Sequence, residues 1–291
     1  MRIQTFSILA GSEACNARCP FCISKMTPPL GVELKEPEVN WRNFRIACRL
    51  AERCGTTTAM FTSKGEPTIF PHQITRYLRE MQSFGFPIIE LQSNGILIAE
   101  RPDVYVQHLA DWFELGMTTI ALSVVHWLPE KNRPIYLPYK KEYIDLPGLI
   151  DLLHSQHLSV RLAVIMARGF IDKPADLDGM IEFARKHRVE QLTFRPVNRP
   201  SSSREQEAFA WSMQHHLEPA QLQSIIGYLE LNGTHIMTLS HGAKVYDVHG
   251  QNVCLTDSLT ADSKTEDIRQ LIFFPDGHLR YDWQYPGAIL L

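Results

Sequence analysis

The chain has 291 residues, of which 44% are apolar and 21% charged, and its formal net charge is -3. This length and apolar content suffice for one large domain or two modest ones. The balanced charge argues against a broad nucleic-acid footprint, which usually needs a basic face. No apolar run approaches the roughly 18 residues of a membrane span, and the first residues lack the apolar region of a secretory signal. We therefore expect a soluble, cytoplasmic protein with no membrane or nucleic-acid partner.

Short strand-like runs alternate with amphipathic helical patterns over about the first 200 residues. Six strands are predicted, at Ile3–Leu9, Thr58–Thr62, Ile88–Gln92, Thr118–Val124, Ser159–Met166 and Gln191–Phe194. Helices are predicted between them, near residues 40–54, 73–83, 104–115 and 175–187. This alternation is typical of a parallel sheet built from βα units. Six units predict an α/β fold, a partial (β/α)6 TIM-like barrel, rather than a closed eight-stranded one.

The remaining residues, 201–291, change in character and are predicted to form a C-terminal α+β extension that caps the barrel of residues 1–200. Their pattern predicts a helix near residues 219–231 and a β-hairpin at Ile268–Trp283 that turns at Asp276–Gly277. Two insertions interrupt the βα rhythm: Trp127–Pro147, with four prolines and three tyrosines, and Arg199–His216, with three consecutive serines. Both are predicted at the C-terminal face of the strands, where barrel sites form.

Three of the six cysteines, Cys15, Cys19 and Cys22, lie within eight residues in the spacing C-x3-C-x2-C. In a chain without an export signal, such clustering indicates metal ligation rather than disulfides. Three thiolates can hold a cubane iron–sulfur cluster and leave one iron open to a small-molecule ligand. A structural zinc site would need a fourth ligand, from Cys48, Cys54 or a histidine. A non-catalytic zinc or iron–sulfur module is therefore the alternative from another functional class.

The cysteine motif, with the aromatic Phe21 before the third cysteine and a strand just before the first, resembles the signature of radical S-adenosylmethionine (SAM) enzymes. The resemblance covers roughly residues 3–200. It implies that Cys15, Cys19 and Cys22 bind one [4Fe-4S] cluster and that SAM chelates the open iron. It further implies reductive cleavage of SAM to a 5'-deoxyadenosyl radical, which abstracts hydrogen from an organic substrate.

Other strand ends carry motifs that resemble the same family. Ser63–Thr68, of sequence SKGEPT, is similar to the family's Gly-Gly-Glu-Pro motif, which implies that Gly65 and Glu66 contact the methionine ammonium of SAM. Lys64 departs from the usual glycine, and it points either at the substrate or to solvent. Ser93, in a stretch similar to the family's Thr-Asn-Gly motif, and Ser123, at the end of the fourth predicted strand, are implied to lie at the cofactor.

The fifth and sixth strands resemble the branch that contains the molybdenum-cofactor GTP cyclase. On that resemblance Arg161 holds the methionine carboxylate of SAM, a task suited to a guanidinium fork; the alternative is a surface arginine at a strand edge. Arg195, at the end of the sixth strand, stands where the family supports the adenine. His126 and Arg168 follow strand ends and are candidates for contact with a polar or anionic substrate, as Arg195 also is.

The tail resembles the extension of auxiliary-cluster (SPASM/twitch) enzymes, but the expected cysteines are replaced by Asp282 and Trp283. A single cluster is therefore predicted. Cys254 is a candidate hydrogen donor to a substrate radical, or else a simple buried thiol. We expect the substrate to be a small metabolite or nucleotide, with modification of a ribosomally made peptide as the closest competitor, and the electron donor to be a flavodoxin or ferredoxin.

Overall fold

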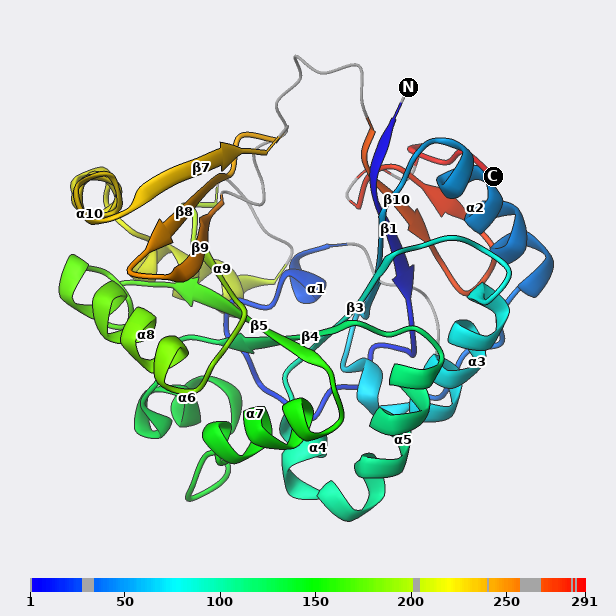
Figure 1. The fold of residues 1–291 in the computed structure, drawn as a ribbon, viewed down its shortest axis with the longest axis horizontal. Coiled ribbons are helices and arrows are strands. Elements are labelled where there is room, and N and C mark those ends of the chain that lie inside the picture. The colour runs from blue at the N-terminus through cyan, green and yellow to red at the C-terminus, as the bar shows by residue number, and fades with distance from the viewer. Residues whose placement is uncertain are drawn as a thin grey trace.

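A single curved sheet forms the centre of the protein (Figure 1). The structure, a computed structural model, describes residues 2–27, 34–200, 205–239, 241–256, 268–283, 285 and 287–291. The strands are β1 Ile3–Leu9, β2 Thr58–Thr62, β3 Ile88–Ser93, β4 Thr119–Val124, β5 Ser159–Met166, β6 Gln191–Pro196, β7 Thr234–Thr238, β8 Lys244–Val248, β9 Gln251–Leu255, β10 Ile268–Phe273 and β11 Leu279–Arg280. Their order is β11-β10-β1-β2-β3-β4-β5-β6-β9-β8-β7, so the sheet is not closed. The eight consecutive strands β10-β1-β2-β3-β4-β5-β6-β9 of this order are parallel to one another.

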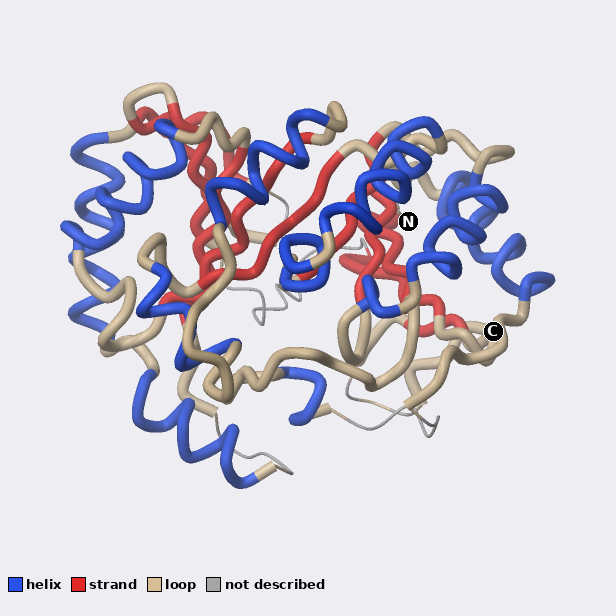
Figure 2. Tube along the Cα trace, turned by 90° about the horizontal axis from the view of Figure 1, so that it is seen from below, coloured by secondary structure: helices blue, strands red, loops and turns tan. Residues whose placement is uncertain are grey.

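The helices are α1 Ile23–Met26, α2 Trp41–Arg53, α3 Pro71–Met81, α4 Ile96–Glu100, α5 Pro102–Glu114, α6 Pro129–Tyr136, α7 Leu146–Ser155, α8 Pro174–Lys186, α9 Gln206–His215 and α10 Pro219–Asn232, with a 3-10 turn η1 at Pro67–Ile69. Of these, α2, α3, α5, α7 and α8 lie along the convex side of the sheet, whereas α1 lies within its curve (Figures 1 and 2). N-cap side chains define the first turns of two helices. The Asn40 side chain accepts a hydrogen bond from Asn43 N at the start of α2, and the Asp145 side chain accepts one from Gly148 N at the start of α7.

The two faces of the sheet differ because side chains alternate along each strand. Toward the helices, Phe61, Leu91 and Leu162 are fully buried and pack with helix residues in one apolar cluster. The opposite face, which we call the polar inner face, carries two rows of laterally paired residues. One row is Gln92, Ala121, Arg161, Gln191 and Asn252; the other is Ser123, Ala163, Thr193 and Cys254. An interior so lined suits a polar ligand rather than a packed apolar core.

The expected fold class, an α/β partial barrel with a parallel sheet, is confirmed. All six predicted strands are present within two residues of their expected ends. The predicted tail helix and hairpin are present as α10 and as β10 with β11. Strands β7 to β9 were not predicted. The division at residue 200 and the capping role of residues 201–291 stay predictions, and Ser201–Ser203 of the second insertion lie outside the described residues.

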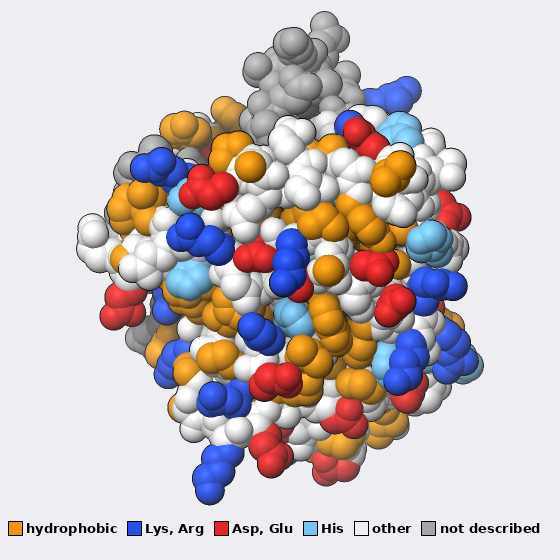
Figure 3. All heavy atoms as spheres, turned by 90° about the vertical axis from the view of Figure 1, so that its left-hand side faces the viewer, with side chains coloured by type: hydrophobic (Ala, Val, Ile, Leu, Met, Phe, Trp, Pro, Cys, Tyr) orange, Lys and Arg blue, Asp and Glu red, His pale blue; other side chains and the backbone are white. Residues whose placement is uncertain are grey.

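The tail also extends the sheet, which the sequence did not reveal. β9 pairs with β6 and β10 pairs with β1, both in parallel, so tail residues lengthen both sides of the six-stranded sector. On the face that carries α8 and α10, acidic and basic side chains are interspersed (Figure 3). Within the described ranges, we find no helix with the length and apolar content needed to cross a membrane.

Candidate active site

The three clustered cysteines lie on the loop that joins β1 to α1. Cys15 is exposed, while Cys19 and Cys22 are partly buried, and all three thiols are free. The loop is internally braced, because Cys22 N donates to Cys19 O over 3.3 Å and Ala17 N donates to Cys15 Sγ over 3.4 Å. Cys22 is also the N-cap residue of α1.

Desolvation by the surrounding protein atoms raises the pKa of the Cys15 thiol to about 11, although the residue as a whole is exposed, and it also raises the pKa of Cys19. Negative charge on Cys22 raises the pKa of both thiols further. This donor set suits a positively charged iron–sulfur core, which binds thiolates. Among the described residues, no three His, Cys, Asp or Glu side chains already form a group that could hold a metal ion. The assignment of Cys15, Cys19 and Cys22 as ligands stays a prediction.

The loop after β2 lies directly against the cysteine loop. Glu66 N donates to Ala14 O over 2.8 Å. A Cβ atom at Gly65 would lie 1.9 Å from the same Ala14 oxygen, which is closer than any real contact. Only glycine therefore allows the two loops to approach this closely. Gly65 approaches the protein's own backbone, and its contact with SAM stays a prediction.

The Glu66 carboxylate is buried and joins the ends of β2 and β3. Its Oε1 accepts from Thr68 N at 3.1 Å, Thr68 Oγ1 at 2.7 Å and Ser93 Oγ at 2.8 Å, and its Oε2 accepts from Asn94 N at 2.9 Å. Burial raises the pKa of Glu66, and these hydrogen bonds oppose that rise. Oε2 has one such donor among the described residues, so this oxygen has room for a further donor such as an ammonium.

Ser93 and Asn94 extend this network to the cysteine loop. The Ser93 hydroxyl donates to Glu66 and accepts from Gly95 N at 2.9 Å. Asn94 Nδ2 donates to Asn16 Oδ1 at 2.7 Å. Ser93 was predicted from the sequence, whereas Asn94 and Asn16 were not, although Asn94 lies in the stretch similar to Thr-Asn-Gly and Asn16 stands between two of the cysteines.

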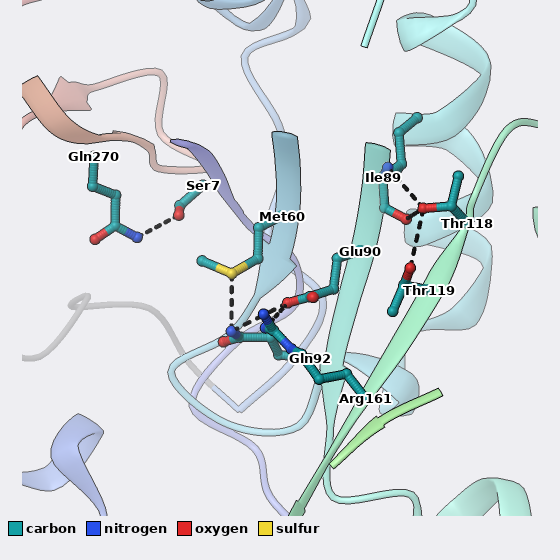
Figure 4. A network of polar contacts seen from close by, with 9 residues as sticks. All are labelled: Ser7, Met60, Ile89, Glu90, Gln92, Thr118, Thr119, Arg161 and Gln270. Carbon is teal, nitrogen blue, oxygen red and sulfur yellow. Dashed lines mark hydrogen bonds and ion pairs between the residues drawn. The ribbon is translucent and has the colours of Figure 1, made fainter. Parts of the chain in front are cut away.

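Arg161 lies on the polar inner face, where its guanidinium pairs with the Glu90 carboxylate of β3 (Figure 4). The exposed fractions of the two side chains are 19% and 6%, so this is a largely buried ion pair. Arg161 Nε has no partner among the described residues. The structure therefore contradicts the alternative of a surface arginine, and a contact with the methionine carboxylate stays a prediction.

Arg195 and Cys254 lie further along the same face. Within the described part of the chain, the buried Nε of Arg195 has no hydrogen-bond partner. Burial and the charge of Arg161 lower the pKa of Arg195. Cys254, on β9, is partly buried, and burial raises its pKa while both arginines lower it. Ser123, at the opposite end of the row that contains Cys254, is partly buried.

The three candidate substrate residues have different positions. Lys64 is 7% exposed and donates to Thr27 Oγ1, so its side chain does not point to solvent. His126 is 4% exposed, and its Nδ1 accepts from Leu128 N at 3.1 Å; burial lowers its pKa to about 4. Arg168 is exposed and donates to the Gln214 carbonyl at the end of α9. Of these, Lys64 is bonded to the segment that follows the cysteine motif, because Thr27 is the C-cap residue of α1.

The insertion at Trp127–Pro147 includes α6 and contacts the cysteine loop. Arg18 N donates to Tyr136 O over 3.0 Å, and the Tyr139 hydroxyl donates to the Asn16 carbonyl. The Phe21 ring lies 6.3 Å from that of Tyr136 and 5.3 Å from that of Trp211 on α9. Thus both insertions supply aromatic side chains around Phe21. The three tyrosines of the first insertion were the sequence signal for this contact.

Comparisons with known proteins agree with this arrangement. Residues 10–148 match the family model described as the Radical SAM superfamily. The chain is 23% identical over 181 residues to the GTP 3',8-cyclase of Chlorobaculum tepidum, an alignment that covers 62% of this chain and 49% of that protein. It thus spans about half the length of that curated relative.

Two solved structures share the fold. One, described as native anSMEcpe with bound AdoMet, has a TM-score of 0.61 and 11% identity, and the match covers 99% of this chain and 77% of that one. The other, a radical SAM methyltransferase from Sphaerobacter thermophilus, has a TM-score of 0.58 and 14% identity, with 95% and 70% covered. Enzymes of this superfamily bind a [4Fe-4S] cluster and SAM. Residues 10–148 thus match the radical SAM superfamily, and the curated relative and the solved structures that share the fold are enzymes.

Proposed function

We propose that this protein cleaves SAM reductively and abstracts hydrogen from an organic substrate bound over the polar inner face. A [4Fe-4S] cluster on Cys15, Cys19 and Cys22 would supply the electron and a site for the methionine group of SAM. The observation that carries the proposal is the junction of three loops. The cysteine loop, the Gly65–Glu66 loop and the Ser93–Asn94 turn are hydrogen-bonded to one another at the carboxyl end of the parallel strands.

The protein's own part in this reaction is to bind and orient the cofactor. Glu66 Oε2 would accept from the methionine ammonium, beside the backbone of Gly65. Ser93 and Ser123 would lie along the cofactor, and Arg161 would direct its second guanidinium edge toward the methionine carboxylate. Phe21, held between Tyr136 and Trp211, would pack against the cofactor and exclude water. Arg195 would support the adenine from the end of β6.

Substrate chemistry is proposed from the same face. Arg195 is partly buried, and its Nε has no hydrogen-bond partner among the described residues, which favours a ligand with an anionic or carbonyl group. This agrees with a small metabolite or nucleotide; a ribosomally made peptide is the second candidate. His126 and Lys64 are proposed at the rim of the site, while Arg168, which is bonded to α9, is the weakest candidate for substrate contact.

Cys254 is proposed as the group that returns a hydrogen atom to a substrate radical. It lies in the row of Thr193 on the polar inner face, and both Arg161 and Arg195 act on its charge. The same proposal includes a flavodoxin or ferredoxin as electron donor and a cytoplasmic location, where thiols stay reduced.

The test is an anaerobic assay of the reconstituted, dithionite-reduced protein with SAM, in which 5'-deoxyadenosine is measured by mass spectrometry. We expect 5'-deoxyadenosine from the wild type and none from Cys19→Ala. Cys48→Ala is the matched control, because Cys48 is fully buried among the apolar residues of α2, on the side of the sheet away from the site. That variant should keep its cluster and its activity.

Two results would contradict the proposal. One is a brown, fully loaded protein that yields no 5'-deoxyadenosine with or without a panel of nucleotides and small metabolites. The other is a colourless protein with one stoichiometric zinc, which would favour a zinc-stabilised scaffold. More than about five irons per chain would contradict the single cluster.

A further inference from the structure

Two tyrosines of the first insertion have buried hydroxyl groups without partners. Tyr136 is the last residue of α6, and Tyr143 lies just before α7. The Oη atoms of both are buried, and neither makes a hydrogen bond to any described residue. A buried hydroxyl without a partner is unfavourable, and in native proteins it usually indicates a missing group such as an ion or a ligand.

Other buried tyrosines of the chain do have partners. The hydroxyl of Tyr77 donates to Leu9 O at 3.3 Å, and that of Tyr105 donates to Thr68 O at 2.6 Å. Tyr77 and Tyr136 are 0% and 1% exposed, so their burial is the same while their hydrogen bonding differs. The unsatisfied hydroxyls are therefore a local property of the insertion.

Both phenols lie beside the cysteine loop. The backbone of Tyr136 accepts from Arg18 N at 3.0 Å, and its ring meets Phe21 edge-on with a centroid distance of 6.3 Å. The Tyr143 ring lies 6.0 Å from that of Tyr136. Burial raises the pKa of each phenol, so both hydroxyls keep a hydrogen to donate. Arg18 and Phe21 flank Cys19 in the sequence.

We propose that Tyr136 and Tyr143 are positioning residues whose hydroxyls donate hydrogen bonds to sulfur atoms of a [4Fe-4S] cluster at its Cys19 side. This inference rests on the proposed function, because it needs the cluster. Thiolate and sulfide sulfurs accept hydrogen bonds, and a reduced cluster carries one more negative charge than an oxidised one. Hydrogen bonds at the sulfurs therefore stabilise the reduced form and raise the reduction potential. The insertion would thus make the cluster easier to reduce.

The test compares Tyr136→Phe, Tyr143→Phe and the double variant with Tyr77→Phe as matched control. The midpoint potential of each reconstituted protein is measured without SAM by a redox titration followed by electron paramagnetic resonance. We expect a shift to a more negative potential in each single variant, a larger shift in the double variant and none in Tyr77→Phe.

A second measurement uses the same proteins before reconstitution. Without the cluster, Tyr136→Phe and Tyr143→Phe each remove an unpaired hydroxyl, so their Tm should equal or exceed that of the wild type. Tyr77→Phe removes a satisfied hydrogen bond, so its Tm should fall. A purely structural role of the two phenols would lower Tm in all three variants.

Two outcomes would overturn the inference. One is a double variant with a complete cluster and the wild-type potential. The other is a fall in the Tm of cluster-free Tyr136→Phe and Tyr143→Phe as large as that of Tyr77→Phe. Neither outcome affects the proposed function, which fails instead if the wild type does not assemble a cluster.

Discussion

The Asn94 side chain on the β3 turn donates from Nδ2 to Oδ1 of Asn16, which stands between the first two cysteines, over 2.7 Å. A second hydrogen bond, from Glu66 N to Ala14 O over 2.8 Å, joins the same loop to the loop that follows β2. The cysteine loop is therefore fixed at two points to neighbouring strand ends. The position of this loop therefore depends on Glu66 and Asn94, which are far from it in the sequence.

Gly65→Ala should displace the cysteine loop, because the new Cβ would meet the Ala14 backbone oxygen at 1.9 Å. Overpacking of this kind typically costs about 1–3 kcal/mol of unfolding free energy. We expect that loss in urea unfolding and reduced iron uptake on reconstitution. Gly227→Ala is the control: this position in α10 has nothing within 4 Å of the added methyl, and it should gain roughly 0.5–1 kcal/mol. Equal behaviour of the two variants would contradict the close packing of the loops.

Arg161→Ala should destabilise the fold by leaving Glu90 without its cation at 6% exposure. Breaking a buried pair typically costs about 3–5 kcal/mol. Arg45→Ala, which removes the exposed pair with Glu80, should cost less than about 1 kcal/mol. Both are measured by urea unfolding, and similar losses would show that the Arg161–Glu90 pair is not buried in solution.

Cofactor binding by Arg161 is separable from this stability effect. In an Arg161→Gln/Glu90→Gln double variant neither member of this pair is left charged, so most of the loss seen in Arg161→Ala should be recovered. If Arg161 binds the SAM carboxylate, calorimetry should still show SAM affinity weaker by about 1.5–3 kcal/mol, as for a lost charged hydrogen bond. Wild-type affinity for SAM in the double variant would show that a residue other than Arg161 binds the SAM carboxylate.

His126 should make stability fall in mild acid. Burial lowers its pKa from 6.5 to about 4, so the unfolded chain binds a proton in this window that the folded protein does not. The free energy of unfolding should therefore decrease as pH falls from 6.5 toward 4, by up to about 3 kcal/mol. Comparing urea unfolding at pH 7 and 5, His126→Gln should show a smaller loss than the wild type. The exposed His235→Gln should behave as the wild type does; an identical loss in His126→Gln would exclude this residue as the cause.

Cys254→Ala should keep the iron content and the formation of 5'-deoxyadenosine, because the thiol lies on β9 and not on the cysteine loop. If Cys254 returns hydrogen to a substrate radical, the variant should lose solvent deuterium from the product made in heavy water. Loss of iron in this variant would instead make Cys254 a cluster ligand.

Sequence patterns predicted the elements whose determinants are local. The six strands from β1 to β6 each combine a short apolar run with turn residues at its end, and the motifs at Cys15, Glu66 and Ser93 follow such ends. Because parallel strands bring their carboxyl ends to one edge, these positions were expected to meet, and their loops do meet.

The elements and contacts that the sequence did not reveal depend on long-range contacts in the folded protein. β7 is exposed along its length, so its sequence shows no alternation of buried and exposed residues. The pairing of β9 with β6 depends on which strand edge is free in the folded sheet, and a local sequence pattern does not report this. Likewise the role of Glu66 in joining β2 to β3 depends on donors from Thr68, Ser93 and Asn94 that converge only in the folded state.

The parallel pairing of β10 with β1 has a consequence for biosynthesis. β1 leaves the ribosome before every other strand of this sheet, whereas its partner on that side, Ile268–Phe273, is made after β9. Until then the β1 edge presents unpaired amide and carbonyl groups, a template for association with other chains. Such distant contacts also slow folding. The nascent protein should therefore depend on chaperones until synthesis passes β10, and a chain stopped after β9 should aggregate rather than form a smaller barrel.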